Sequence, residues 1–503
     1  MSTLLALARI RAARQGRAEP LRQVRHYHLV DEPLVLVTAA MAGEAAAPLA
    51  CMVGTDRHRP VLLTVSQPRN RDQQQAFYAQ LAAVVLPYIR RRENALQQLP
   101  THTGKAARQR CADAPQLIVA NRATVEHLRL VGRSLRFQGS REPGTTQAPV
   151  ALLGRWLTFF TEQADYPGSC LLLPMTRQLA AHWASGQSAL EDESLAALLA
   201  WIEPPSGLSG AEAALRTENP VEFPPAGPAT DPTFDLVELE PRMRAHRHAL
   251  AAGDHTSANR SAAKLERALD AQLRPTWNQL WSALALLRAI PPAARCARRW
   301  DDDRDQFTRH SLHLMHGGPP QPVHDHPVEA ARRLAALERA SHMFEDEQAL
   351  DDPFVLAERR AAGAAFAGIV ISREPDRQAR SPKGRRVLRP RFTVRTDDPP
   401  PLTRDQDLLN PHRPRATARI HQITHEQSGT HLIIMEITSG MGTPSRPAAD
   451  AVPELGERVC YTASPSQWAQ PEFPSRDQTP WTHSHPVPPA PARDLDPHDA
   501  DPA

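Results

Sequence analysis

The feature that most constrains the fold is a series of five short β-type runs in the C-terminal third of the chain. Turn-rich segments separate the runs, which are Phe366–Ile371, Arg385–Thr396, Ala416–Thr424, Thr430–Thr438 and Gly456–Thr462. Runs of this length and spacing predict a small antiparallel barrel, an architecture that often binds nucleic acid. We therefore expect a five-stranded, OB-like β-barrel over residues 366–462.

The chain of 503 residues is too long for a single core and predicts an α+β protein of about three domains. With 49 prolines and 23 glycines, interruptions are frequent. We expect an α/β domain over 1–150 and a helical region over 151–350 with a Pro-rich connector at 204–232. The barrel and a disordered tail at 465–503 follow, since the tail has few aliphatic residues.

Local patterns support this division. Apolar runs at Leu34–Ala39, Ala47–Val53 and Val61–Val65 precede a strongly periodic segment, Asp72–Arg92, which predicts three strands and a helix. Helical spacing then dominates the middle of the chain, where Pro275 separates two predicted helices. Gly132 and Gly154, each followed by an arginine, are interpreted as helix-associated turns.

Charge and cysteine usage limit the functional classes. The net charge is only +3, so a basic surface must be local, and with three lysines in the chain arginine carries nearly all positive charge. Codon bias explains that preference, although the planar guanidinium also suits phosphate contacts. Five scattered cysteines without a CxxC pair indicate a reducing compartment, and no apolar run reaches the length of a membrane span. We expect a cytoplasmic protein without a membrane partner.

The second barrel run carries the first candidate site. It contains Arg385, Arg386, Arg389, Arg391 and Arg395. Strand alternation predicts that the last three share one face while Phe392 and Val394 face the core. A row of arginines on a barrel suits contact with a phosphate backbone, and the alternative is an ordinary exposed charged face.

A second candidate lies at the start of the Asp72–Arg92 helix. Arg69 and Arg71 flank Asn70 there. Helix N-termini favour anions, so these two arginines are candidate nucleic-acid contacts. The alternative is a solvated helix cap provided by Asn70 or Asp72.

The N-terminal strand order resembles the core of restriction-endonuclease-like, metal-dependent nucleases. Asp56 matches the first acid of that family, but the second motif falls on Thr64-Val65-Ser66, which has neither acid nor lysine. The resemblance implies a degenerate or relocated metal site, because carboxylates must hold the metal that activates water. The alternative is an ordinary α/β domain.

Other catalytic signatures are incomplete. His310, His313, His316, His324 and His326 have spacings that metal sites use, but glycines and prolines interrupt the second half, and we assign no metal. Thr103-Gly104-Lys105 lacks the remaining residues of a phosphate-binding loop. We therefore expect no nucleotide cofactor and no ATP hydrolysis.

The barrel resembles the small β-barrel inserted in the first motor domain of superfamily 1 helicases. The resemblance covers about a fifth of the chain and rests on Phe366–Val370, Arg389–Phe392, Ile433–Ile437 with Gly440-Met441-Gly442, and Pro453–Val459. It implies a partner or a detached relative of such a motor and not the motor itself, since the chain has no Walker motif. The function we favour is a non-catalytic nucleic-acid-associated accessory or scaffold protein. The alternatives are a divergent metal-dependent nuclease and a structural protein–protein interaction protein.

Overall fold

A computed structural model describes residues 3–45, 47–99, 108–138, 149–381, 384–398, 406–426, 429–444, 446–448, 450–464 and 471–475. The helices are α1 (Thr3–Gln15), α2 (Arg71–Glu93), α3 (Arg122–Leu135), α4 (Pro149–Gln163), α5 (Met175–His182), η1 (Glu191–Glu193), α6 (Leu195–Ile202), α7 (Gly210–Arg216), α8 (Pro232–Phe234), η2 (Asp235–Leu239), α9 (Glu240–Ala251), α10 (His255–Ala289), α11 (Cys296–Met315), α12 (Pro327–Asp351) and α13 (Pro353–Ala361). The strands are β1 (Glu19–Pro20), β2 (Leu34–Ala40), β3 (Pro48–Gly54), β4 (Val61–Thr64), β5 (Leu96–Leu99), β6 (Arg108–Cys111), β7 (Leu117–Val119), β8 (Leu172–Pro174), β9 (Trp183–Ala184), β10 (Ala365–Glu374), β11 (Gln378–Arg380), β12 (Arg386–Leu388), β13 (Arg391–Thr396), β14 (Asp407–Asn410), β15 (Arg413–His425), β16 (His431–Ser439), β17 (Gly442–Thr443), β18 (Arg446–Pro447) and β19 (Arg458–Ala463).

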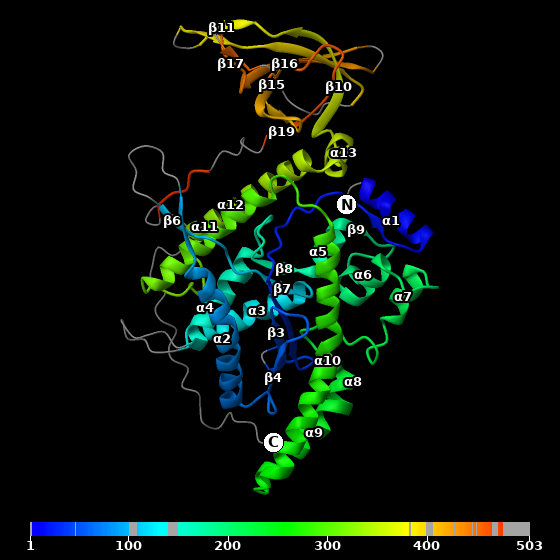
Figure 1. Cartoon of the computed structure of the whole chain (residues 1–503), viewed down its shortest axis with the longest axis vertical. Coiled ribbons are helices and arrows are strands. Elements are labelled where there is room, and N and C mark those ends of the chain that lie inside the picture. The colour runs from blue at the N-terminus through cyan, green and yellow to red at the C-terminus, as the bar shows by residue number, and fades with distance from the viewer. Residues whose placement is uncertain are drawn as a thin grey trace.

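The body of the molecule is built around a five-stranded mixed sheet with the order β4-β3-β2-β7-β8 (Figure 1). β2, β3 and β4 form an antiparallel meander, and β7 and β8 run parallel to β2. All of β2 and nearly all of β3 are buried, because both consist largely of apolar or small residues. The predicted N-terminal α/β architecture is confirmed.

Helix α2 follows the meander as its periodicity predicts. Asn70 caps it, since its side chain accepts a hydrogen bond from the Gln73 backbone N–H at 3.0 Å. The helix then buries Phe77, Leu81 and Val85 in the core of the body.

Two glycines lie where helices α3 and α4 cross, and the prediction of turns at these positions is wrong. A Cβ on Gly154 would lie 2.4 Å from the Arg136 backbone nitrogen, and one on Gly132 would lie 2.8 Å from that of Thr158. No such contact fits, so both positions require glycine for the helices to approach this closely.

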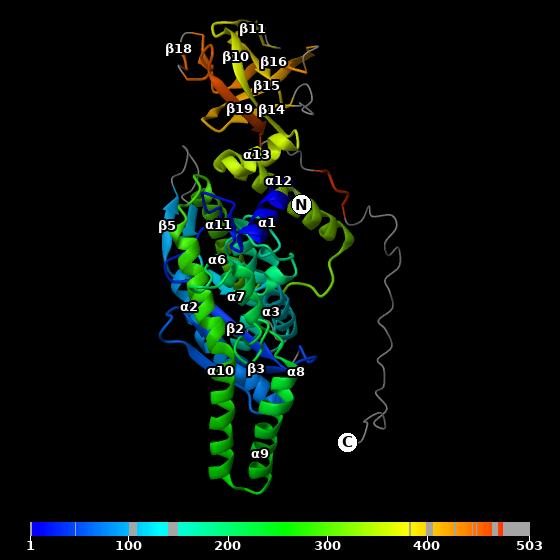
Figure 2. The ribbon, with the colours of Figure 1, turned by 90° about the vertical axis from the view of Figure 1, so that its right-hand side faces the viewer.

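The helices predicted on either side of Pro275 are one continuous helix, α10. It packs across β2 and β3, and its Trp277 indole donates a hydrogen bond to the Arg57 carbonyl at 2.8 Å. Tertiary packing therefore outweighs the loss of one helical hydrogen bond at proline. α9 and the first part of α10 run antiparallel and project below the body as an arm (Figure 2).

One hydrophobic core runs through the whole body, from Ala18 to Phe344. The sheet takes its fifth strand, β8, from beyond residue 150, the domain boundary expected from the sequence. The segments 1–150 and 151–350 therefore share a single core in this structure.

A closed barrel with its own core follows, in the order β10-β13-β16-β15-β14-β19. The predicted barrel is confirmed, but in the described part of the chain it has six strands rather than five. The strand missed is β14, which is only four residues long. The predicted run Arg385–Thr396 is also divided, because Pro390 has no N–H for a ladder and β12 pairs with β11 in a separate hairpin.

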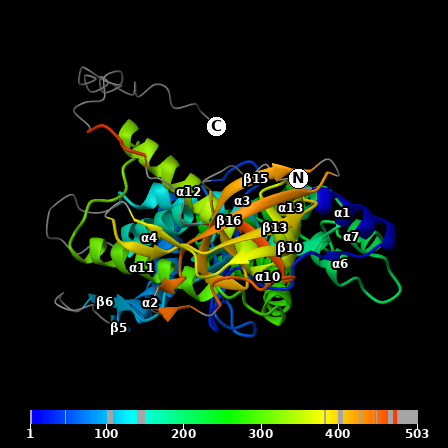
Figure 3. The ribbon, with the colours of Figure 1, turned by 90° about the horizontal axis from the view of Figure 1, so that it is seen from above.

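Alternation along β13 follows the prediction. Phe392 and Val394 are buried in the barrel, whereas Arg391 and Arg395 point outward. In the view from above, the barrel strands lie over the helices of the body (Figure 3).

Helices α12 and α13 connect the body to the barrel. Arg360 at the end of α13 forms a two-pronged ion pair with Asp398, at 2.7 and 3.0 Å, and Asp398 also accepts a hydrogen bond from the Ala367 backbone N–H. Burial opposes ionisation of Asp398, but these hydrogen bonds outweigh it and lower the carboxyl pKa.

Two expectations concern residues that the structure leaves undescribed. The predicted tail, 465–503, lies outside the described residues except for 471–475, and Thr103-Gly104-Lys105 lies outside them entirely. Among the described helices, none combines the length and the apolar character needed to cross a membrane.

Candidate binding surfaces

The arginines of the barrel divide into two sets, and the first set is neutralised by carboxylates. Arg391 donates to Glu436 at 2.8 Å, directly across from it in the β13–β16 register, and Arg377 donates to the same carboxylate at 2.9 Å. Three more ion pairs lie elsewhere on the barrel: Arg373–Glu454, Arg413–Glu457 and Arg419–Asp407. These guanidinium groups are already occupied.

The predicted row of Arg389, Arg391 and Arg395 is therefore not uniform. Arg389 lies between β12 and β13, and its guanidinium donates to the Thr438 carbonyl at 3.2 Å. Arg395 is exposed and stands opposite Leu432 and Ile369, with no ion pair to a described residue. Of these three residues, Arg395 is the one available to an external anion.

The second set of arginines lies on two small hairpins at the end of the barrel farthest from α13 (Figures 1 and 2). Arg380 and Arg386 face each other in the β11–β12 register, and Arg385 precedes Arg386 in the turn. Arg446 lies on the β17–β18 hairpin, and β17 packs beside β12. All four are exposed, and none forms an ion pair with a described carboxylate. We call these four residues the distal arginine cluster.

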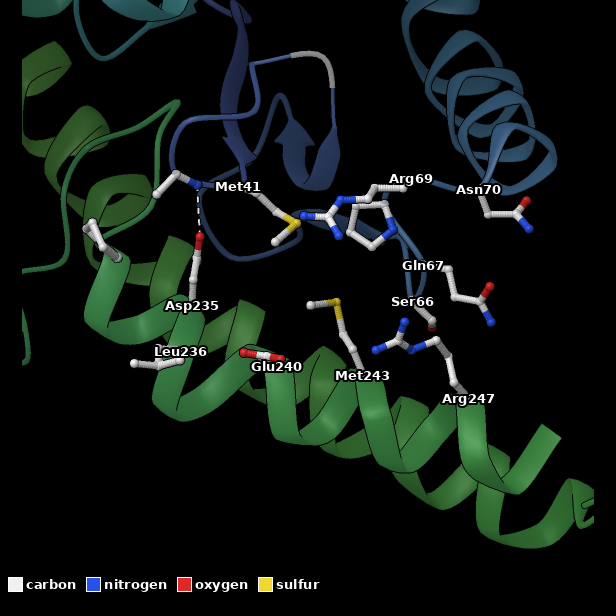
Figure 4. A pocket seen from close by; sticks show the side chains of 13 residues that line it. Met41, Ser66, Gln67, Arg69, Asn70, Asp235, Leu236, Glu240, Met243 and Arg247 are labelled. Carbon is white, nitrogen blue, oxygen red and sulfur yellow. Dashed lines mark hydrogen bonds between the residues drawn. The ribbon is translucent and has the colours of Figure 1, made fainter. Parts of the chain in front are cut away.

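The second sequence candidate, at the start of α2, lies beside a cleft of about 470 Å³ (Figure 4). Arg69 and Asn70 line it, whereas Arg71 is exposed outside the lining. Arg69 is held by Glu44, to which its Nε donates at 3.0 Å. The same contact lowers the pKa of Glu44 and raises the pKa of Arg69.

The opposite wall of the cleft is formed by the π-helical turn η2 and helix α9. Asp235 fixes this wall to the body, because its carboxylate accepts hydrogen bonds from the Ala42 backbone N–H at 2.8 Å and the Thr230 hydroxyl at 2.5 Å. Arg247 extends from α9 and is exposed. Figure 4 shows the guanidinium groups of Arg69 and Arg247 directed into the cleft from its two walls, with the side chain of Met243 between them and that of Met41 beside Arg69.

The histidine-rich segment has structural contacts instead of a common centre. His310 on α11 stacks on Phe159, with ring centroids 4.3 Å apart, while His313 contacts the Pro319 carbonyl at 2.9 Å and His326 caps α12. Burial, with a smaller contribution from the positive charge of Arg155, lowers the pKa of His310 to about 3. Within the described ranges, no group of three or more His, Cys, Asp or Glu side chains is arranged to hold a metal ion.

The residues matched to the nuclease motif do not meet. Asp56 lies in the turn beyond Val53 and Val61, where its carboxylate accepts a hydrogen bond from the His58 backbone N–H at 2.9 Å. Thr64 pairs with Ala50 at the other end of the hairpin. At 3.3 Å per residue, the strand alone separates the two positions by roughly 10 Å.

Comparison with known proteins gives no relative. No protein-family model matches the chain, and no curated protein or solved structure matches it significantly.

Sequence reasoning missed Arg247 and the hairpin arrangement of Arg380 and Arg386. A signal for the hairpin exists, because Pro382-Lys383-Gly384 is a turn sequence in the middle of the basic run. No local pattern indicates Arg247, since its approach to Arg69 depends on how α9 docks against the body.

Proposed function

We propose that the chain is a non-catalytic nucleic-acid-associated protein, an accessory or scaffold, and that the distal arginine cluster contacts the phosphate backbone. The observation that supports this proposal most directly is that Arg380 stands opposite Arg386 in the β11–β12 hairpin. Neither arginine has a carboxylate partner among the described residues. Like charges opposite each other in a hairpin are destabilising, and a bound polyanion removes that repulsion.

The contrast within the barrel supports this choice. Residues 365–464 contain 15 Arg and Lys residues against 11 Asp and Glu residues, so the barrel alone has a net charge of +4. Carboxylates on the sides of the barrel neutralise Arg373, Arg391, Arg413 and Arg419. Among the described barrel residues, the exposed arginines without an ion pair are the four of the distal arginine cluster and Arg395, Arg415 and Arg458, so most of them belong to that cluster. Positive charge gathered at one protruding end favours contact with an extended polyanion.

A salt titration of DNA and RNA binding tests the proposal. Replacing Arg380, Arg385 and Arg386 by alanine should weaken binding alike on all base sequences. The slope of log affinity against log salt should fall by about 2–3 units, since each phosphate contact contributes about 0.7–0.9. Folding should be unchanged, because these side chains are exposed.

The matched control removes three exposed arginines from the body: Arg14, Arg260 and Arg267. It changes the net charge equally and should leave the slope unchanged. Equal loss in both variants would mean that only total charge matters. Absence of salt-dependent binding by the wild type would favour the structural interaction protein instead.

The helicase partner follows from the resemblance of the barrel alone. A separately encoded helicase is the first protein partner to test, by co-purification with the wild type and with a chain that ends before β10.

A further inference from the structure

The cleft between the 66–70 loop and α9 has the features of a small-molecule site. Its volume of about 470 Å³ lies in the range of ligand pockets and is several times what an inorganic phosphate fills. It also lies beside η2, and π-helical turns of this kind often occur at functional sites.

Positive charge defines one end of the cleft. Arg69 and Arg247 approach from opposite walls, and Ser66, Gln67 and Asn70 add hydroxyl and amide groups beside them (Figure 4). Glu44, which holds Arg69, lies outside the lining, and Arg247 forms no ion pair with a described residue. Glu44 takes up Nε and Nη2 of Arg69, so the donors that remain for a ligand are Nη1 of Arg69 and the guanidinium of Arg247. Two such donors facing one cleft are suited to bind a phosphate.

The remaining surface is suited to an organic group. Met41 and Met243 line the cleft beside the arginines with polarizable thioethers, and such side chains pack well against planar rings. Glu240 lies farther along α9, with an ion pair to Arg244 at 2.9 Å, and its carboxylate can accept hydrogen bonds from hydroxyl or amino groups of a ligand.

Both walls are held by contacts that do not require a ligand. Glu44 positions Arg69, and Gln74 donates to the Pro68 carbonyl at 2.6 Å, which fixes the loop. Asp235 fixes the other wall through Ala42 and Thr230. The cleft is therefore preorganised, which reduces the entropic cost of binding.

We propose that this cleft binds a nucleoside monophosphate, with the phosphate between Arg69 and Arg247 and the base over Met41 and Met243. This site is in the body, far from the distal arginine cluster, and it is independent of the function proposed for the barrel. The proposal assigns binding only and no chemical step.

Isothermal titration calorimetry with AMP, GMP, CMP and UMP tests it on the full chain. At least one of the four should bind, and Arg247→Ala should weaken that binding about tenfold or more, because a hydrogen-bonded charge contributes about 1.5–3 kcal/mol. Arg69→Ala should have a similar effect. The matched control, Arg260→Ala on α10, removes an exposed arginine outside the cleft and should bind like the wild type.

Two further titrations test the nucleoside part and the phosphate part of the ligand separately. The matching nucleoside and inorganic phosphate should each bind much more weakly than the nucleotide. If phosphate alone binds equally well, the cleft does not recognise the organic part and the assignment of a nucleoside monophosphate is overturned. If the nucleoside binds equally well, or if none of the four nucleotides binds at millimolar concentration, the assignment is overturned.

The barrel variant distinguishes the two proposals. Replacement of Arg380, Arg385 and Arg386 should leave nucleotide binding in the cleft intact. If it abolishes nucleotide binding, the calorimetric signal comes from the barrel and the proposed cleft site is wrong.

Discussion

At the scale of single residues, partial burial of His310 in the body favours its neutral form. His310 packs against Phe159 and Trp156 at the contact between α4 and α11, with ring centroids 4.3 and 4.9 Å away. Because its folded pKa of about 3 is below the ordinary value, its contribution to stability is complete above pH about 6.5 and is lost as the pH falls toward 3.

We predict that His310→Phe makes the body less sensitive to acid. Phenylalanine keeps the stacked ring and cannot be protonated. Between pH 6.5 and 5, His310 should account for up to about 2 kcal/mol of the stability that the wild type loses. Urea unfolding at several pH values, followed by tryptophan fluorescence, measures this. The exposed His316→Gln variant should behave like the wild type. If His310→Phe loses as much stability as the wild type between pH 6.5 and 5, the prediction is contradicted.

At the scale of secondary-structure elements, the tight crossing of α3 and α4 depends on the absence of two side chains. Gly154→Ala should lower the free energy of unfolding by roughly 2–3 kcal/mol, because the added Cβ meets backbone atoms of Leu135 and Arg136 that cannot move aside easily. Thermal unfolding measures the loss.

The exposed Glu126→Ala variant on α3 is the control, and it should shift the free energy of unfolding by only a few tenths of a kcal/mol. If Gly154→Ala melts at the same temperature as the wild type, α3 and α4 can move apart without loss of stability and the prediction is wrong.

The sequence predicts those elements whose pattern is local. β2 and α2 were found because an apolar run and a 3.6-residue period are visible within a few residues. β14 was missed because it is short, and α10 was divided because its packing on the sheet overrides Pro275. The candidate arginine site on the barrel was likewise predictable only as far as its pattern is local. Alternation along β13 placed Arg395 correctly, but the carboxylate partner of Arg391 comes from β16 and could not be read from the run itself.

At the scale of the whole molecule, the body and the barrel have separate hydrophobic cores joined through α12 and α13. We predict two transitions in calorimetry. Residues 365–464 contain no tryptophan, so tryptophan fluorescence should report the transition of the body and not that of the barrel.

The Asp398→Asn variant should lower only the barrel transition, by roughly 4–10 °C, because it weakens the hydrogen bonds from Arg360 and Ala367. The exposed Asp376→Asn variant should leave both transitions in place. A single cooperative transition at all scan rates would show that the two cores unfold together.

The closure of the barrel also limits how it can be recognised. In the described residues the six strands form a closed ring, in which each strand is hydrogen-bonded to two neighbours along part of its length. The ends of β10 and β15, residues 372–374 and 422–425, extend past one of their two neighbours. β-augmentation, in which a partner strand pairs with an unpaired backbone edge, is therefore limited in the barrel to short strand ends such as these, whereas β4 is an edge strand of the body sheet. Over the paired part of the ring, ligands must be selected by side chains, and single substitutions there should change specificity directly.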